Sequence, residues 1–296
     1  MSIKKKNIQE YPFIWMAPLL LILIIFYLFP ILEVTRLSFS NATLLNNPTK
    51  YGIFQYLSLF KSPDFFQMLK ATFYYVIGSL IFQILLGLCI AVLVHEGKKR
   101  GIRGAVLTRS VVLSCWIIPA PAIGVIWKII LSEFDYGIAN YILMILFGKH
   151  LPLLSNERLA LLSITIANIW CGTAFSMLIL FSGLQQIPEE LYEAAMVDGA
   201  HALQKFRFIT LPLLKPFIFT DLSLATIYTF NSFGLIMSLT AGGPGRSTEV
   251  LALNVYRTIF DRMNLGRGAA LSMILLLINL IIAVAYNKSF MKKDSF

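Results

Sequence analysis

Apolar segments of about twenty residues alternate along the chain with shorter polar segments. They cover residues 13–32, 71–94, 111–131, 159–184, 217–239 and 269–286. A helix of about twenty residues crosses the roughly 30 Å hydrocarbon core of a bilayer. The pattern therefore predicts an all-α integral membrane protein with six transmembrane helices. A further apolar segment at residues 137–147 is too short to span, and we expect a short helix at the interface or on the extracytoplasmic side.

The composition supports the same class. Of the 296 residues, 57% are hydrophobic and 14% charged, and the mean hydropathy is +0.75, which is more apolar surface than a soluble domain of this length buries. Cys89, Cys115 and Cys171 all lie within apolar segments, so neither a disulfide framework nor a metal site is predicted. The net charge of +10 does not indicate nucleic-acid binding, because the Lys and Arg residues lie at the ends of apolar segments rather than in one stripe.

Clustered basic residues predict the orientation in the membrane. They flank the first, second and sixth apolar segments at Lys4, Lys5 and Lys6, at Lys98, Lys99, Arg100 and Arg103, and at Lys288, Lys292 and Lys293. Because basic clusters next to spans stay in the cytoplasm, both termini and the loop at residues 185–215 are predicted to be cytoplasmic. A cleaved secretory signal is the alternative for the first segment, but that segment is longer than a signal and ends at Phe29-Pro30 without a small-x-small site.

The predicted organisation is thus a cytoplasmic N-terminal tail at residues 1–12, a transmembrane domain at 13–286 and a cytoplasmic C-terminal tail at 287–296.

The polar loop that contains residues 188–212 is longer than most helix connections, which need about two to eight residues. Pro188 followed by Glu189 and Glu190 favours a helix start, and we expect a short helix from Glu189 to about Asp198. Gly199 would end it in the left-handed conformation, and residues 200–208 would form one or two further helical turns. Leu211-Pro212 would then redirect the chain into the fifth span. Read by composition alone, the same loop is equally an ordinary solvated connection.

The order of residues in this loop is more specific than its composition. Glu193, Ala194 and Ala195 are followed after three residues by Gly199, and after nine more by Ile209, Leu211 and Pro212. This pattern resembles the cytoplasmic signature of permease subunits of binding-protein-dependent ABC importers at every position. The segments at residues 188–192 and 198–200 resemble the carbohydrate branch of that family.

Other segments extend the resemblance over nearly the whole chain. Residues 239–244 and 248–251 resemble a loop of the first of the two paired permeases of that branch, and residues 137–140 resemble its third external segment. The chain lacks the large external insertion and additional N-terminal helices of some maltose-type members, which weakens an assignment to maltose itself. Ala71 stands before Thr72 where Asn is common.

The resemblance implies a set of partners. These are a second permease in a heterodimer, two cytoplasmic ATPase subunits that use ATP and Mg, an extracytoplasmic solute-binding protein and a carbohydrate substrate. The resemblance also implies a location in a bacterial plasma (inner) membrane, where the spans contact lipid. No cofactor or metal is expected on this chain. The first helix of the loop would dock on the ATPase. The residues to which the resemblance assigns ATPase coupling are Glu193, Ala194, Ala195, Asp198, Gly199, Ile209, Leu211 and Pro212.

Polar and aromatic side chains within the spans are candidates for the substrate path, because polar groups in lipid usually face a bundle interior or a cavity. The candidates are Gln83, Asn168, Trp170, Asn231, Phe233 and Asn279, with Tyr74, Tyr75 and Phe175 as further aromatic faces. The alternative is that the amides hydrogen-bond one helix to another. Snorkelling is the expected explanation for Asp221 and Lys128, which lie near the predicted ends of their spans. Pro119 and Pro121 are expected to break the third span.

Two other function classes fit less well. A self-contained secondary transporter or channel would require an ionisable side chain deep in the bundle, and the predicted span centres hold almost none. A membrane enzyme would require a catalytic cluster, whereas His95, His150 and His201 fall in loops or at span ends. The chain also lacks a GxxxxGK[ST] phosphate loop, so ATP would have to bind to another subunit.

Overall fold

The computed structural model describes residues 12–291 of the chain, and the parts of the predicted tails at residues 1–11 and 292–296 lie outside the described residues. The described residues form helices and a single isolated antiparallel bridge between Ser40 and Tyr51. Their helices are α1 (Pro12–Leu23), η2 (Ile24–Leu28), α2 (Phe29–Ser38), α3 (Phe54–Phe60), α4 (Pro63–Lys99), α5 (Gly104–Ile117), α6 (Ala120–Ile130), α7 (Ile138–Phe147), α8 (Glu157–Leu184), α9 (Glu189–Val197), α10 (Ala202–Lys205), η3 (Phe206–Thr210), α11 (Leu211–Phe230), α12 (Gly234–Leu239), α13 (Leu251–Phe260) and α14 (Leu265–Met291).

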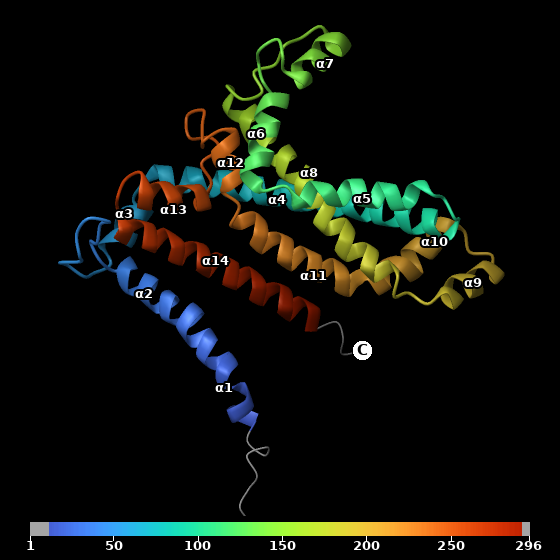
Figure 1. Cartoon of the computed structure of the whole chain (residues 1–296), viewed down its shortest axis with the longest axis horizontal. Coiled ribbons are helices and arrows are strands. Elements are labelled where there is room, and N and C mark those ends of the chain that lie inside the picture. The colour runs from blue at the N-terminus through green and yellow to red at the C-terminus, as the bar shows by residue number, and fades with distance from the viewer. Residues whose placement is uncertain (1–11, 292–296) are drawn as a thin grey trace, which may run out of the picture. The chain divides into compact units, whose positions relative to one another are not determined.

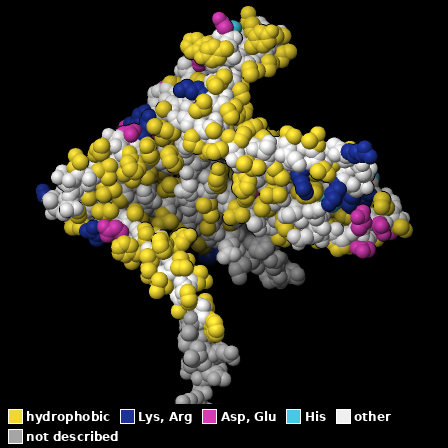
Figure 2. Space-filling model, viewed as in Figure 1, with side chains coloured by type: hydrophobic (Ala, Val, Ile, Leu, Met, Phe, Trp, Pro, Cys, Tyr) yellow, Lys and Arg dark blue, Asp and Glu magenta, His cyan; other side chains and the backbone are white. Residues whose placement is uncertain are grey.

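The chain divides into two compact units. Unit 1 comprises Met1–Lys61 and Val255–Ile274, and unit 2 comprises Ser62–Asn254 and Leu275–Phe296. Five helices of the described part are long and apolar enough to cross a membrane, and a sixth span results if α5 and α6 are counted together. Figure 2 shows hydrophobic side chains spread over the surfaces of these helices, as a protein that contacts lipid requires.

In unit 1, α1, η2 and α2 continue one another and form a span at Trp15–Ser38. The helix widens at η2, where the Phe29 amide donates to the Ile24 carbonyl five residues earlier. Pro30 follows immediately, and because its ring would clash with the carbonyl four residues before it, the wider turn lets the helix continue. Beyond the span, the Gly266 amide at the start of α14 donates to the Ala42 carbonyl at 2.8 Å.

In unit 2, α8 packs against α4, α5 and α11 (Figure 1). Small residues permit this close packing, as is common between helices in membranes. A side chain at Gly87 of α4 would lie 2.6 Å from the Cβ of Ser176 on α8, and one at Gly172 of α8 would lie 2.0 Å from Oε1 of Gln83. A buried apolar cluster completes the packing of α4, α8 and α11. It consists of Ala91, Val94, Met177, Leu180, Phe181, Leu184 and Leu214.

The third predicted span is broken, as its prolines indicate. α5 ends at Ile117 and α6 begins at Ala120, and the two helices are bent by 104°. Ile118 is extended, which is the conformation that a following proline favours, and Pro119 caps the start of α6. α6 then packs on α12, where Gly124 approaches the Leu235 carbonyl so closely that a Cβ would lie 2.6 Å from it.

The prediction for the fifth span was wrong at both ends. The helix runs from Ala202 to Phe230 through α10, η3 and α11, and α12 is a separate short helix. Hydropathy continues across the break at residues 231–233, but the Asn231 amide group donates to the Ile227 carbonyl and ends the helix there.

The prediction that Leu211-Pro212 redirects the chain was also wrong. Pro212 follows the π-turn η3, in which the Leu211 amide donates to the Phe206 carbonyl five residues earlier. Because this wider turn makes room for the proline ring, the helix continues into α11. The same arrangement of π-turn and proline occurs at Phe29-Pro30.

The remaining predicted elements are present. The short apolar segment at residues 137–147 forms α7, which is too short to span. The sixth span forms the long helix α14.

Candidate functional site

The predicted helix in the polar loop is α9, which runs over Glu189–Val197. It follows Pro188, whose extended conformation caps the helix, and Glu189 and Glu190 lie in the first turn, where they face the positive end of the helix dipole. The sequence prediction of this helix is confirmed within one residue. Acidic side chains gather at the end of unit 2 that carries α9, next to basic ones (Figure 2).

Gly199 ends α9 in the way the sequence predicts. Its φ is +78°, and the Gly199 and Ala200 amides donate to the Met196 and Ala195 carbonyls at 3.0 and 2.8 Å. This pair of bonds is the Schellman arrangement, which needs a left-handed residue at this position. No atom lies within 4 Å of where a Cβ at Gly199 would be, so the backbone conformation alone requires the glycine there.

One face of α9 is exposed and apolar. Leu191 and Val197, with exposed fractions of 43% and 89%, lie on it with Ala194 at three-residue steps. Ala194 and Glu193 are also exposed, and no side chain of the described residues forms an ion pair with Glu193. An exposed apolar patch with a carboxylate at its side is typical of a protein interface.

The opposite side of α9 is held to the rest of unit 2. Lys99 at the end of α4 forms an ion pair with Glu189 at 3.1 Å, and its Nζ lies 4.7 Å from the ring centroid of Tyr192. The Tyr192 hydroxyl is 2.8 Å from Oγ1 of Thr210, which lies just before α11. These groups border a cavity of about 330 Å³ between α4, α9 and η3. A movement of α9 would therefore act directly on α4 and on the helix that leads into α11.

The other predicted coupling residues lie apart from the exposed face of α9. Asp198 is the C-cap residue of α9 and is exposed, and Ala195 is half-buried. Ile209, Leu211 and Pro212 belong to η3 and α11, which continue as the fifth span. The predicted coupling residues are therefore divided between the exposed helix α9 and the start of the fifth membrane-spanning helix.

A second candidate site lies within the predicted spans of unit 2. A cavity of about 290 Å³ is bordered by side chains from α4, α5, α8 and α11, among them Gln83, Trp116, Phe175 and Tyr228. The Trp116 and Phe175 ring centroids are 5.7 Å apart. One amide among aromatic rings suits a sugar, because the amide both donates and accepts hydrogen bonds and the rings cover apolar ring faces.

The structure places only Gln83, of the six candidates, on this cavity. The others lie elsewhere: Asn168 is buried on α8, Trp170 packs on Trp127, Asn231 and Asn279 donate to carbonyls of their own helices, and Phe233 caps α12. Sequence reasoning named Phe175 as an aromatic face but missed Trp116 and Tyr228. Both are aromatic residues within apolar segments, and only the packing of α5 and α11 against α8 brings them together.

The expectation that Asp221 snorkels was wrong. Asp221 is fully buried at the middle of α11, and the Ser176 hydroxyl of α8 donates to its carboxylate at 3.1 Å. Because the helix begins at Ala202 rather than at residue 217, Asp221 is several turns from the helix end. Since Asp221 is an ionisable side chain deep within a span, the span centres do not distinguish this chain from a secondary transporter. Lys128 is exposed, as expected.

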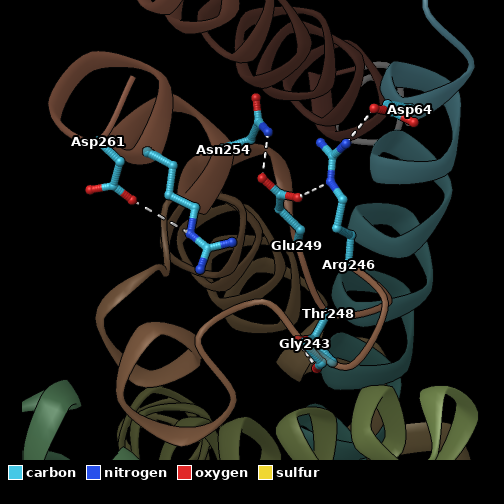
Figure 3. Close-up of polar contacts among 8 residues, drawn as sticks. Asp64, Gly243, Arg246, Thr248, Glu249, Asn254 and Asp261 are labelled. Carbon is cyan, nitrogen blue, oxygen red and sulfur yellow. Dashed lines mark hydrogen bonds and ion pairs between the residues drawn. The ribbon is translucent and has the colours of Figure 1, made fainter. Parts of the chain in front are cut away.

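The loop after α12 is held by an ionic network (Figure 3). Arg246 donates to the carboxylate of Glu249 at 2.5 Å and pairs with Asp64 in the first turn of α4. Glu249 is 1% exposed and also accepts from the Asn254 amide at 2.6 Å. The hydrogen bond to Glu249, together with the nearby carboxylates, raises the pKa of Arg246. The loop around residues 239–251, which resembles a loop of the first of two paired permeases, is thus fixed to the start of α4.

A second loop, between α6 and α8, is held by Glu133. Its carboxylate accepts from the Leu154 amide, the Ser155 amide and the Ser155 hydroxyl at 2.8, 2.7 and 2.8 Å. Partial burial acts to raise the pKa of Glu133, but these hydrogen bonds favour the ionised form, and the pKa lies below its ordinary value. The bonds fix the end of the segment that follows α7.

The two sites and the helices that carry them define a helical membrane protein with an exposed interaction helix and an internal cavity. Comparison with known proteins gives the family. The model of the binding-protein-dependent transport system inner membrane component family matches residues 8–289, and the chain belongs to that family.

Two relatives illustrate the similarity. The trehalose/maltose transport system permease protein of Thermococcus litoralis is 31% identical over 93% of this chain and 92% of its own length. The sn-glycerol-3-phosphate transport system permease protein of Rhizobium meliloti is 31% identical over 90% of each chain. A bacterial ABC transporter involved in the import of the acidic polysaccharide alginate has the same fold, with a TM-score of 0.81, 21% identity and 95% coverage of both chains. Family membership, rather than the number of ionisable groups in the spans, decides against a secondary transporter.

Proposed function

We propose that this chain is a membrane-spanning permease subunit of an ATP-driven importer for a carbohydrate or carbohydrate-like solute, and that α9 is its contact with the ATPase. The observation that carries the proposal is the exposed apolar face of α9, with Val197 89% exposed, on a helix that Lys99 and Tyr192 connect to two membrane helices. ATP and Mg are used by the partner subunit, and this chain binds no cofactor of its own.

The basic residues next to the spans support an orientation with α9 in the cytoplasm and the Arg246 loop outside. In this orientation the Arg246 loop faces the solute-binding protein. The cavity around Gln83 lies on the solute path between the two sides of the membrane. A second permease subunit forms the other half of that path. Similar permeases are named for trehalose and maltose and for glycerol 3-phosphate, which supports a hydroxyl-rich solute.

Coupling requires that the ATPase move α9 as a rigid body. The Schellman end at Gly199 fixes the exit of the chain from α9, and Glu193 lies at the side of the exposed apolar face, where a basic group of the ATPase would pair with it. The contacts of Lys99 and Tyr192 then transmit the movement to α4 and to the helix leading into α11.

The test is uptake by the assembled importer in proteoliposomes, with ATP hydrolysis measured in the same vesicles. Glu193→Lys is expected to insert normally and to lose most uptake per ATP hydrolysed. Asp135→Lys, the same charge reversal at an exposed position of the α6–α7 loop, is the matched control and is expected to retain it. Uptake per ATP that is unchanged in Glu193→Lys, or equally reduced in Asp135→Lys, contradicts the proposed role of α9.

A further inference from the structure

A groove of about 680 Å³ runs along the outside of unit 2 between α4 and α8. We call it the α4–α8 groove. Its α4 side presents Lys70, Tyr74, Gly78 and Phe82, which recur every four residues and therefore lie along one face of the helix. Tyr74 and Phe82 are 61% and 56% exposed. The groove is thus open to its surroundings rather than filled by the chain.

The α8 side of the groove is apolar except at one end. Leu162 and Ile166 are 53% and 41% exposed, and Arg158 lies at the start of the helix. Thr165 is the one hydroxyl residue that lines the α8 side of the groove, and it donates to the Leu161 carbonyl of its own helix at 2.7 Å. The α8 side of the groove therefore offers few hydrogen-bond partners to a hydroxyl-rich solute.

The two cations of the groove lie at the same end. Lys70 immediately precedes the apolar segment at residues 71–94, and Arg158 immediately precedes that at 159–184. α4 and α8 run in the same direction here, since Gly78 lies against Thr165 further along both helices. Neither Lys70 nor Arg158 forms an ion pair with a carboxylate of the described residues, and Nζ of Lys70 lies 5.8 Å from the Tyr74 ring centroid. Both cations therefore lie at the boundary between hydrocarbon and headgroups with their charge unneutralised.

The length of the groove matches one leaflet. From Lys70 to Phe82 the helix rises roughly 18 Å at about 1.5 Å per residue. Half of a hydrocarbon core is about 15 Å thick. A molecule that begins at the cations and follows the groove would thus have a polar head at the interface and a chain that reaches the bilayer centre.

We propose that the α4–α8 groove binds an anionic phospholipid, with its phosphate at Lys70 and Arg158 and an acyl chain along Tyr74, Phe82 and Ile166. Basic positions between membrane helices bind anionic headgroups in this way. A helix of a partner subunit would fit the apolar walls but would have to place a carboxylate at the two cations, which is costly near hydrocarbon. An anionic lipid matches both the charge and the length of the groove, and it needs no carboxylate near hydrocarbon because its phosphate already lies at the interface. The inference does not depend on the proposed orientation, which decides only whether the lipid belongs to the outer leaflet.

The test uses the assembled transporter in nanodiscs with equal amounts of phosphatidylglycerol and phosphatidylcholine, and native mass spectrometry to count retained lipids. The expected result is preferential retention of phosphatidylglycerol by the unmodified protein. Lys70→Gln combined with Arg158→Gln is expected to reduce that preference on the order of thirty-fold, because each cation near an anionic surface contributes about five-fold. Ile166→Trp, which fills the groove and keeps both charges, is expected to reduce retention of both lipids.

Lys128→Gln combined with Lys149→Gln is the matched control. It removes two exposed cations outside the groove and is expected to leave the preference unchanged. Equal retention of phosphatidylglycerol by the Lys70/Arg158 variant and the control overturns the inference. So does a cross-link from Leu162→Cys to the partner permease in the assembled transporter, because it would show that protein covers the groove. Either result leaves the proposed coupling role of α9 intact.

Discussion

Substitutions at Gly199 test whether the backbone at the end of α9 transmits force. A residue with a Cβ at φ +78° costs about 1–2 kcal/mol, because the Cβ approaches the following carbonyl. Since no atom lies within 4 Å of the Cβ position, Gly199→Ala carries this backbone cost and no clash. Gly199→Val adds the strain of a β-branched residue, to about 3 kcal/mol, whereas Asn tolerates the conformation. About 1.4 kcal/mol changes an equilibrium tenfold, so the Schellman end becomes on the order of tenfold less favourable in the alanine variant.

The assay is uptake per ATP hydrolysed in proteoliposomes, with the amount of inserted protein measured in the same samples. We expect uptake per ATP to fall in the order wild type, Gly199→Asn, Gly199→Ala and Gly199→Val, while insertion stays unchanged. Wild-type coupling in the valine variant would refute the argument from backbone conformation. Equal loss in the asparagine and valine variants would also refute it, because that result would point to side-chain volume in a site that the structure shows to be open.

Four further outcomes follow from individual contacts. Arg246→Met is expected to destabilise the protein by about 3 kcal/mol in thermal unfolding, because the buried Glu249 carboxylate loses its ion pair with the Arg246 guanidinium. Lys99→Gln is expected to change stability by less than about 1 kcal/mol, since its ion pair is exposed, but to lower uptake per ATP. Gln83→Leu is expected to raise the KM for uptake about five-fold, as the loss of one hydrogen bond predicts. The protection factors of the amides bound by Glu133 are expected to decrease as pH falls through its lowered folded-state pKa, and to keep their full value above the ordinary pKa of glutamate, as measured by hydrogen exchange.

Hydropathy and basic flanks predict how many membrane segments the chain has, but they do not locate a short break between two apolar segments. At residues 231–233 the break is only three residues long, and the Asn231 side chain donates to the Ile227 carbonyl where the helix ends. The prolines reveal the break between α5 and α6, but its bend of 104° also depends on the packing of Gly124 against α12, which is distant in sequence.

The coupling segment was predictable because its signals are local. A helix start at Pro188 and a left-handed stop at Gly199 depend on neighbouring residues alone. The cavity around Gln83 was not predictable, because four helices contribute to it. The position of Asp221 was predicted wrongly for a related reason. The sequence places the start of the fifth span at residue 217 instead of Ala202, so Asp221 was expected at the end of the span, whereas it lies in the middle.

The most direct test of the account is a cross-link from α9 to an ATP-binding subunit. A photo-reactive group at position 197, where Val197 is 89% exposed, is compared with one at Tyr136, which is 65% exposed in the α6–α7 loop. In membranes that contain the assembled importer, we expect an adduct from position 197 with a subunit that sequencing identifies as ATP-binding, and none from position 136. The claim that α9 is the contact with the ATPase is contradicted if an importer that assembles with its ATPase gives no such adduct from position 197. It is also contradicted if position 136 gives the adduct.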